Sequence, residues 1–184
     1  MGINLSVFRL FGLIAIITIY AQIDAIHHVL IWNRADIMAG QWWRIVTGNL
    51  THANTIHLAM NLTALAAHAM LHRRYYEPHL LGFMILIMMI VIGIAMFFSP
   101  SYLYSGFSGV LHGLFVWGFI RDMQHKAPLG WMFILGIILK LLYEVYTGGD
   151  SMTSDLIGVK VAYQAHCTGA MVGLLFVLKI QHQS

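Results

Sequence analysis

The stretch from residue 79 to residue 98 reads HLLGFMILIMMIVIGIAMFF and contains no Asp, Glu, Lys or Arg. A helix of about 20 residues matches the hydrocarbon thickness of a bilayer, because each residue adds about 1.5 Å. Within lipid, only a helix or a closed barrel satisfies its own backbone hydrogen bonds. The segment therefore predicts a transmembrane helix, and with it an integral membrane protein.

The composition of the whole chain agrees with that prediction. Of 184 residues, 59% are hydrophobic and 9% are charged, whereas soluble domains carry about 25% charged residues. The net charge of +3 comes without a basic run, so nothing indicates a nucleic-acid partner. One cysteine, Cys167, excludes an intramolecular disulfide. We therefore expect an all-α protein whose surroundings are the lipid bilayer.

Apolar blocks recur along the chain and predict a bundle of six transmembrane helices within a single membrane domain, residues 1–184. The blocks cover residues 7–23, 56–71, 79–98, 108–120, 129–143 and 161–180. Arg and Lys gather beside alternate block ends, which predicts cytoplasmic termini by the positive-inside rule. The first block could instead be a cleaved signal peptide, although no small-x-small cleavage site follows it.

The fourth block is too short to cross a bilayer. From Ser108 to Ile120 it offers about 13 residues, or roughly 20 Å of helix against a core of about 30 Å. With Arg121 at one membrane face, Ser108 lies roughly 10 Å below the other. A hydroxyl at that depth is unfavourable unless it has a partner or a water-filled pocket. Ser108 is therefore a candidate functional residue that opens toward the outside.

A second polar group in the sixth block is placed to meet Ser108. His166, Gly169 and Gly173 share one helical face, and Gly109 lies beside Ser108. Small residues at such spacing let helix backbones approach closely, which would bring the imidazole to the hydroxyl. A weak hydroxyl nucleophile needs a base, and neutral histidine is suited to that role.

Acyl transfer also needs donors for the developing oxyanion. His57 and Asn61 lie one turn apart in the second block, and backbone N–H groups begin the fourth. No acidic residue lies in the predicted spans to orient His166, so we expect a dyad rather than a triad. Lys140 and Glu144, near the outer end of the fifth block, are expected to form an i, i+4 ion pair.

Each of these features has an ordinary explanation when taken alone. A serine before a helix is commonly an N-cap, and a transmembrane histidine commonly bridges two helices. The histidines His57, His112 and His166 could also be metal ligands. However, the chain has no His-Glu-x-x-His, and no carboxylate lies in a predicted span. We therefore expect no metal and no cofactor.

Four motifs, in order along the chain, resemble those of the rhomboid family of intramembrane serine proteases. They are Trp43-Arg44, His52 followed by His57 and Asn61, Gly106-Phe107-Ser108-Gly109, and Ala165-His166 followed by Gly169 and Gly173. The resemblance implies a serine endopeptidase that cuts transmembrane protein substrates.

By the same resemblance, Ser108 is the nucleophile and His166 the general base. The residues implied around the oxyanion are His57, Asn61, Gly106, Gly109 and the Ser108 backbone N–H. Trp43 and Arg44 are implied to stabilise an external loop. The alternative is a non-catalytic rhomboid relative that binds membrane proteins, which the presence of both Ser108 and His166 disfavours.

His112 departs from the pattern of many rhomboids, which have a tyrosine four residues after the serine. Ser-Gly-Val-Leu-His-Gly, ending at Gly113, resembles the rhombosortase branch of small bacterial rhomboids. That branch is thought to cleave exported proteins with a C-terminal Gly-Gly motif, a transmembrane helix and a basic tail. It implies a bacterial inner membrane, with the site facing outside. His112 would stack on His166 or fill space, and its protonation would depress activity at mildly acidic pH.

Overall fold

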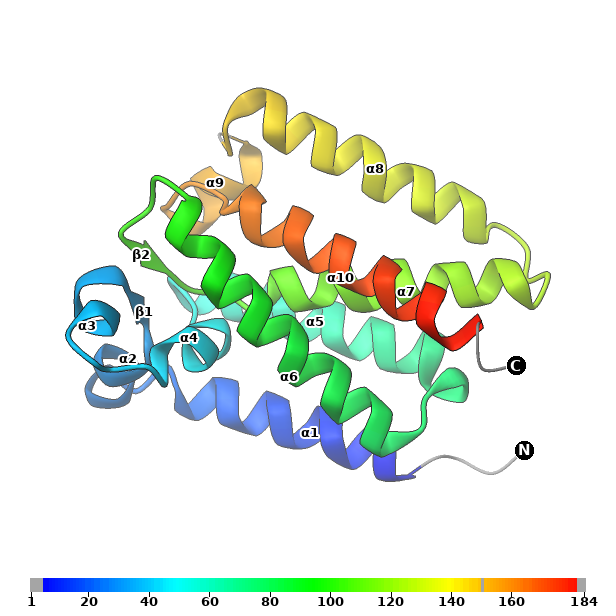
Figure 1. The fold of residues 1–184 in the computed structure, drawn as a ribbon, viewed down its shortest axis with the longest axis horizontal. Coiled ribbons are helices and arrows are strands. Elements are labelled where there is room, and N and C mark those ends of the chain that lie inside the picture. The colour runs from blue at the N-terminus through cyan, green and yellow to red at the C-terminus, as the bar shows by residue number, and fades with distance from the viewer. Residues whose placement is uncertain (1–4, 150, 182–184) are drawn as a thin grey trace.

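The computed structural model describes residues 5–149 and 151–181, which form a bundle of helices with one short two-stranded ribbon (Figure 1). In this part of the chain, six helices have 16 residues or more. They are α1 (Leu5–Tyr20), α5 (Thr55–His72), α6 (Pro78–Ala95), α7 (Ser108–Gln124), α8 (Gly130–Thr147) and α10 (Tyr163–Gln181). Each contains most of one apolar block. In Figure 1, α1 begins and α10 ends at the same end of the bundle.

Shorter elements lie mostly at the opposite end, where the site is. They are α2 (Asp24–Leu30), β1 (Trp32–Asn33), α3 (Arg34–Met38), α4 (Arg44–Thr47), η1 (Gly48–Leu50), η3 (Met96–Phe98), β2 (Leu103–Tyr104) and α9 (Met152–Ile157), with η2 (Arg73–Tyr75) after α5. The two strands are antiparallel, with Trp32 opposite Tyr104. The Trp32 indole is fully buried and donates a 2.9 Å hydrogen bond to the Gly93 carbonyl of α6. This contact fixes the connecting segment against the bundle.

Arg44 holds together the segment between α1 and α5. Its side chain is buried and donates to the carbonyls of His28 and Ile31, at 2.9 and 2.7 Å. It also pairs with the carboxylate of Asp36 at 3.1 Å. The neighbouring Trp43 donates its indole N–H to a carbonyl of α2 at 3.0 Å. Through these contacts both side chains hold α2 and the turn after it against α4.

The central helix is α7, which packs against α5, α6, α8 and α10. Its closest neighbour is α10, because glycines face each other across the contact. A Cβ on Gly109 would lie 2.8 Å from the carbonyl oxygen of Ala165. A Cβ on Gly169 or Gly173 would collide with the carbonyls of Gly109 and Gly113. The small-residue packing predicted from the sequence is therefore present, and it sets the separation of the two helices.

By length and composition, two helices of the described residues can cross a membrane, α6 with η3 (Pro78–Phe98) and α8. A third qualifies only if α1 and α2, which meet at 107°, count as one. Of the remaining long helices, α5 carries several polar residues, α7 has 17 residues, and the apolar part of α10 is limited to Tyr163–Leu178. Helix α8 lies at the edge of the bundle in Figure 1, and 11% of it is buried, compared with 39% of α6.

Helix α8 also extends past its apolar block, which ends at residue 143. It continues to Thr147 and ends at Gly148, whose φ of +63° is the left-handed conformation that commonly terminates helices. Glu144 therefore lies within the helix instead of in the following loop.

Candidate active site

Ser108 is the first residue of α7 and His166 lies in the first turn of α10, at the same end of the bundle. The Ser108 Oγ and the His166 Nε2 are 2.7 Å apart, a hydrogen-bond distance. The close glycine contact between the two helices makes this approach possible. A hydroxyl and an imidazole in this relation can act as nucleophile and general base.

The backbone before Ser108 is shaped by Gly106. Its φ of +132° is a conformation that side-chain-bearing residues rarely adopt, and a Cβ there would lie 2.8 Å from the His57 ring. The Tyr104 hydroxyl donates to the Gly106 carbonyl at 2.8 Å and fixes the turn. Helix α7 then begins at Ser108, where the first backbone N–H groups have no intrahelical acceptor, and no side chain caps them. These are the donors expected near an oxyanion.

His57 and Asn61 lie on α5 and line the same cavity as Ser108 and His166. His57 Nδ1 accepts the backbone N–H of Ala53 at 3.4 Å, which leaves the proton on Nε2. Asn61 donates one amide hydrogen to the His57 carbonyl at 2.9 Å, and its second amide hydrogen remains available. Both side chains therefore retain a donor for the cavity.

His52 precedes α5 and packs edge-on against His57, with ring centroids 5.0 Å apart. Burial, together with repulsion from His57, lowers the pKa of His52 to about 3, so its ring is neutral at ordinary pH. His52 thus supports His57 by packing.

His112 stacks on the proposed base. Its ring lies 4.1 Å from that of His166, at an interplanar angle of 17°. His112 Nδ1 is 2.7 Å from the Ser108 carbonyl, and its Nε2 is 3.1 Å from the Lys140 ammonium. Because a carbonyl only accepts and an ammonium only donates, His112 is neutral, with its proton on Nδ1. The stacking expectation is met, whereas this contact opposes the expectation that His112 becomes charged.

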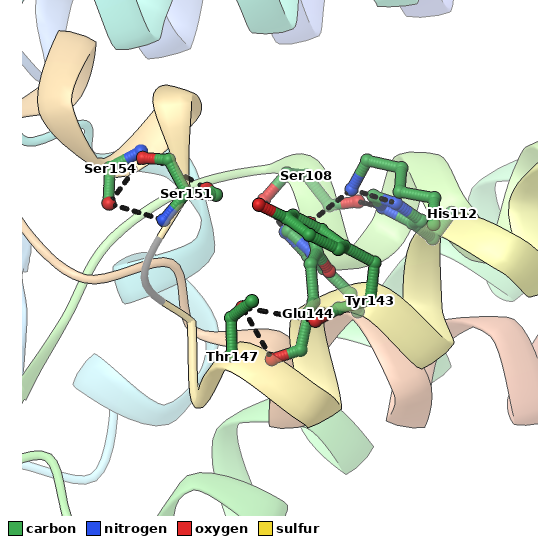
Figure 2. Close-up of polar contacts among 9 residues, drawn as sticks. Ser108, His112, Tyr143, Glu144, Thr147, Ser151 and Ser154 are labelled. Carbon is green, nitrogen blue, oxygen red and sulfur yellow. Dashed lines mark hydrogen bonds and ion pairs between the residues drawn. The ribbon is translucent and has the colours of Figure 1, made fainter.

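Glu144 corrects the sequence analysis. The predicted ion pair with Lys140 is present, but the other carboxylate oxygen lies 2.7 Å from His166 Nδ1. Figure 2 shows Ser108, His112 and Glu144 gathered at one place, with Glu144 on α8. The expectation that His166 has no acidic residue beside it is therefore wrong. A signal was available, because Lys140 and Glu144 are the only ionised residues of α8 and share one face.

These polar groups occupy one end of a cavity of about 880 Å³ between α5, α7, α8 and α10. From there the cavity continues beside apolar side chains to Leu71, Phe119 and Met132, near the opposite end of the bundle. Within the described ranges 5–149 and 151–181, no three His, Cys, Asp or Glu residues are grouped as metal ligands. Cys167 is half-buried.

The fold and this site define a helical membrane protein with a serine and a histidine in hydrogen-bond contact beside a cavity. A family model described as the Rhomboid domain matches residues 39–183, and the chain belongs to the rhomboid family. It is also 23% identical over 159 residues to "Rhomboid protease GlpG" of Haemophilus influenzae (strain ATCC 51907 / DSM 11121 / KW20 / Rd). That match covers 83% of this chain and 77% of the relative. Family and relative support an intramembrane protease.

Proposed function

We propose that this protein is an intramembrane serine endopeptidase that hydrolyses a peptide bond in or near a substrate's transmembrane segment. The observation that carries the proposal is the 2.7 Å contact between Ser108 Oγ and His166 Nε2 at the polar end of the cavity. In this proposal Ser108 is the nucleophile and His166 the general base.

The proposed reaction follows the order of contacts. His166 Nε2 takes the proton of Ser108 as Oγ attacks the scissile carbonyl carbon. The oxyanion receives hydrogen bonds from the Ser108 backbone N–H, His57 and Asn61. His166 then gives its proton to the leaving amine, and a water molecule, deprotonated by the same ring, releases the acyl group.

The proposed substrates are transmembrane proteins, because the cavity continues from the polar site along apolar walls. A substrate helix must unwind to expose its carbonyl, so glycine near the cut favours cleavage. Ser108 followed by Gly109 and His112 supports the rhombosortase branch, whose substrates carry a C-terminal Gly-Gly motif, a transmembrane helix and a basic tail.

The proposed setting is a bacterial inner membrane. All six long helices cross it as one domain, with both termini cytoplasmic and the site open to the outside. The positions of Arg and Lys in the sequence support this orientation. The polar α7 is shielded from lipid by its four neighbouring helices.

A fluorophosphonate probe tests the chemistry directly, because it reacts with an activated serine. We expect wild-type protein in membranes to be labelled, and Ser108→Ala and His166→Ala to lose labelling while folding normally. Ser105→Ala is the matched control, since Ser105 lines the same cavity three residues earlier. Wild-type labelling of Ser108→Ala would refute the proposal.

The substrate class needs a cellular test. In cells lacking the protein, we expect a secreted protein with a C-terminal Gly-Gly tail to accumulate as a longer, membrane-retained form. If proteins without a Gly-Gly motif accumulate instead, the proposed protease activity stands and the rhombosortase assignment is refuted.

A further inference from the structure

The second ring nitrogen of His166 has a specific partner. Glu144 Oε2 lies 2.7 Å from His166 Nδ1, on the side of the ring opposite Ser108. The Glu144 side chain is 4% exposed, and its other oxygen is held by Lys140. Both carboxylate oxygens are therefore engaged, and the group has a single orientation.

This contact decides which nitrogen carries the proton. An ionised carboxylate only accepts, so His166 donates from Nδ1. The Nε2 lone pair is then directed at the Ser108 hydroxyl, which is the tautomer that a general base requires. A hydrogen bond that only joined two helices could use either ring nitrogen of His166. Here the carboxylate contacts Nδ1, which leaves Nε2 for Ser108.

We propose that Glu144 completes a Ser108–His166–Glu144 triad, in which it acts as a positioning residue for His166. This inference rests on the proposed function. As the Ser108 proton moves to Nε2 and the serine oxygen bonds to the acyl carbon, the ring becomes an imidazolium. The adjacent carboxylate stabilises that charge and stays ionised, and the proton leaves later on the amine.

Two further side chains hold the triad in place. The Lys140 ammonium contacts both Glu144 and the Nε2 of His112. His112 in turn stacks on His166 and donates to the Ser108 carbonyl. The contacts close a ring that joins α7, α8 and α10, so the geometry of His166 is fixed from every side.

The test compares Glu144→Gln with Glu77→Gln, which changes the only other glutamate of the chain. Glu77 is exposed at the start of α6 and caps that helix. For Glu144→Gln we expect the fluorophosphonate inactivation rate and kcat to fall about 10³-fold, with KM changed less than about 3-fold. Glu144→Asp should recover part of the rate, and Glu77→Gln should match wild type. A folded Glu144→Gln protein labelled at the wild-type rate overturns the triad.

A magnetic resonance measurement separates this inference from the proposed function. In protein with nitrogen-15 histidine, the hydrogen-bonded Nδ1–H of His166 should give a strongly downfield proton signal. We expect this signal in wild type and in Ser108→Ala, and its loss in Glu144→Gln. Fluorophosphonate labelling that persists in Ser108→Ala refutes the proposed protease activity. A downfield proton signal that persists in Glu144→Gln refutes only the triad.

Should Glu144→Gln fail to fold because Lys140 is left unpaired, the double variant Lys140→Met with Glu144→Gln removes both charges. In this double variant we again expect the fluorophosphonate labelling rate to fall about 10³-fold. A wild-type rate in the double variant overturns the inference.

Discussion

Two hydrogen-bonded chains of similar chemistry lie near opposite ends of the bundle. At the site, contacts run from the Ser108 hydroxyl through His166 to the Glu144 carboxylate. Near the other end, they run from the Tyr76 hydroxyl through His68 and His72 to the Asp122 carboxylate, at 2.8, 3.1 and 3.1 Å. Both chains start at a hydroxyl and end at a carboxylate.

The two chains differ in access. His68 and His72 are fully buried, and the Tyr76 ring stacks on Trp117. Among the described residues that line the large cavity are Ser108, His166 and Glu144, but no member of the Tyr76–Asp122 chain. A hydroxyl, an imidazole and a carboxylate therefore do not make an active site by themselves. In the Tyr76–Asp122 chain they tie α5 to α7, whereas at the site they line the cavity that the proposed substrate would enter.

The largest expected effect is on labelling, and it distinguishes the Ser108 hydroxyl from the Tyr76 hydroxyl. Ser108→Ala should lower fluorophosphonate labelling at least about 10⁴-fold, because the nucleophile is gone. Tyr76→Phe should leave the labelling rate of folded protein within about 2-fold and lower stability by about 1 kcal/mol. Labelling rates and detergent unfolding curves measure both. A Tyr76→Phe protein that folds but is not labelled would break the comparison.

Next comes the helix contact on which the site depends. Gly169→Ala places a methyl group against the Gly109 carbonyl, so α7 and α10 must separate. We expect a stability loss of about 2–4 kcal/mol and a labelling rate at least about 10-fold lower. Gly136→Ala on α8 is the matched control, since its added Cβ meets no atom within 4 Å. Equal melting temperatures and labelling rates for the two variants would contradict the prediction.

A smaller effect is expected at the Tyr76–Asp122 chain. Asp122→Asn removes the charge that pairs with His72 and Arg74, so the free energy of unfolding should fall by about 1–3 kcal/mol. The labelling rate per folded molecule should stay unchanged, because the carboxylate lies far from Ser108 along α7. Asp155→Asn, at an exposed position, controls for charge. A specific loss of labelling in Asp122→Asn would show that the two chains are coupled.

The smallest effect concerns His112. His112→Phe keeps a ring against His166 and loses the contacts to Lys140 and the Ser108 carbonyl. We expect its inactivation rate to fall about 3-fold, and that of His112→Ala about 10-fold, since stacking contributes about 0.5–1.5 kcal/mol. Rates at several pH values test the remaining hypothesis. A loss of activity between about pH 7 and 5.5 that disappears in His112→Phe would support the hypothesis that His112 becomes protonated and inhibits the reaction.

Much of this arrangement could be predicted from the sequence because glycine spacing reports helix contact. Gly109, Gly169 and Gly173 indicated that α7 and α10 approach, and the approach brings Ser108 to His166. The long helices contain the apolar blocks because hydrophobicity marks them directly. The short elements between α1 and α5 depend on tertiary contacts such as those of Arg44, which no local pattern encodes.

Glu144 was missed for a physical reason. An apolar block ends where charges appear, so the sequence predicts the end of the fifth block at residue 143, although α8 continues to Thr147. For a carboxylate just beyond that limit, the sequence predicts only an i, i+4 ion pair with Lys140. Whether its second oxygen met His166 depended on the packing of α8 beside α10, which pattern alone does not give.

Because α8 lies at the edge of the bundle, the choice of detergent or lipid used to purify the protein affects how firmly α8 is held. The carboxylate that faces His166 is carried by α8. Of the two helices that qualify as spans, α8 has the smaller fraction of buried residues. Detergents or thin bilayers that loosen this helix would detach the acid while the serine and histidine stay together on their glycine contact. Preparations that melt at the same temperature would then differ in turnover according to the lipid that surrounds them.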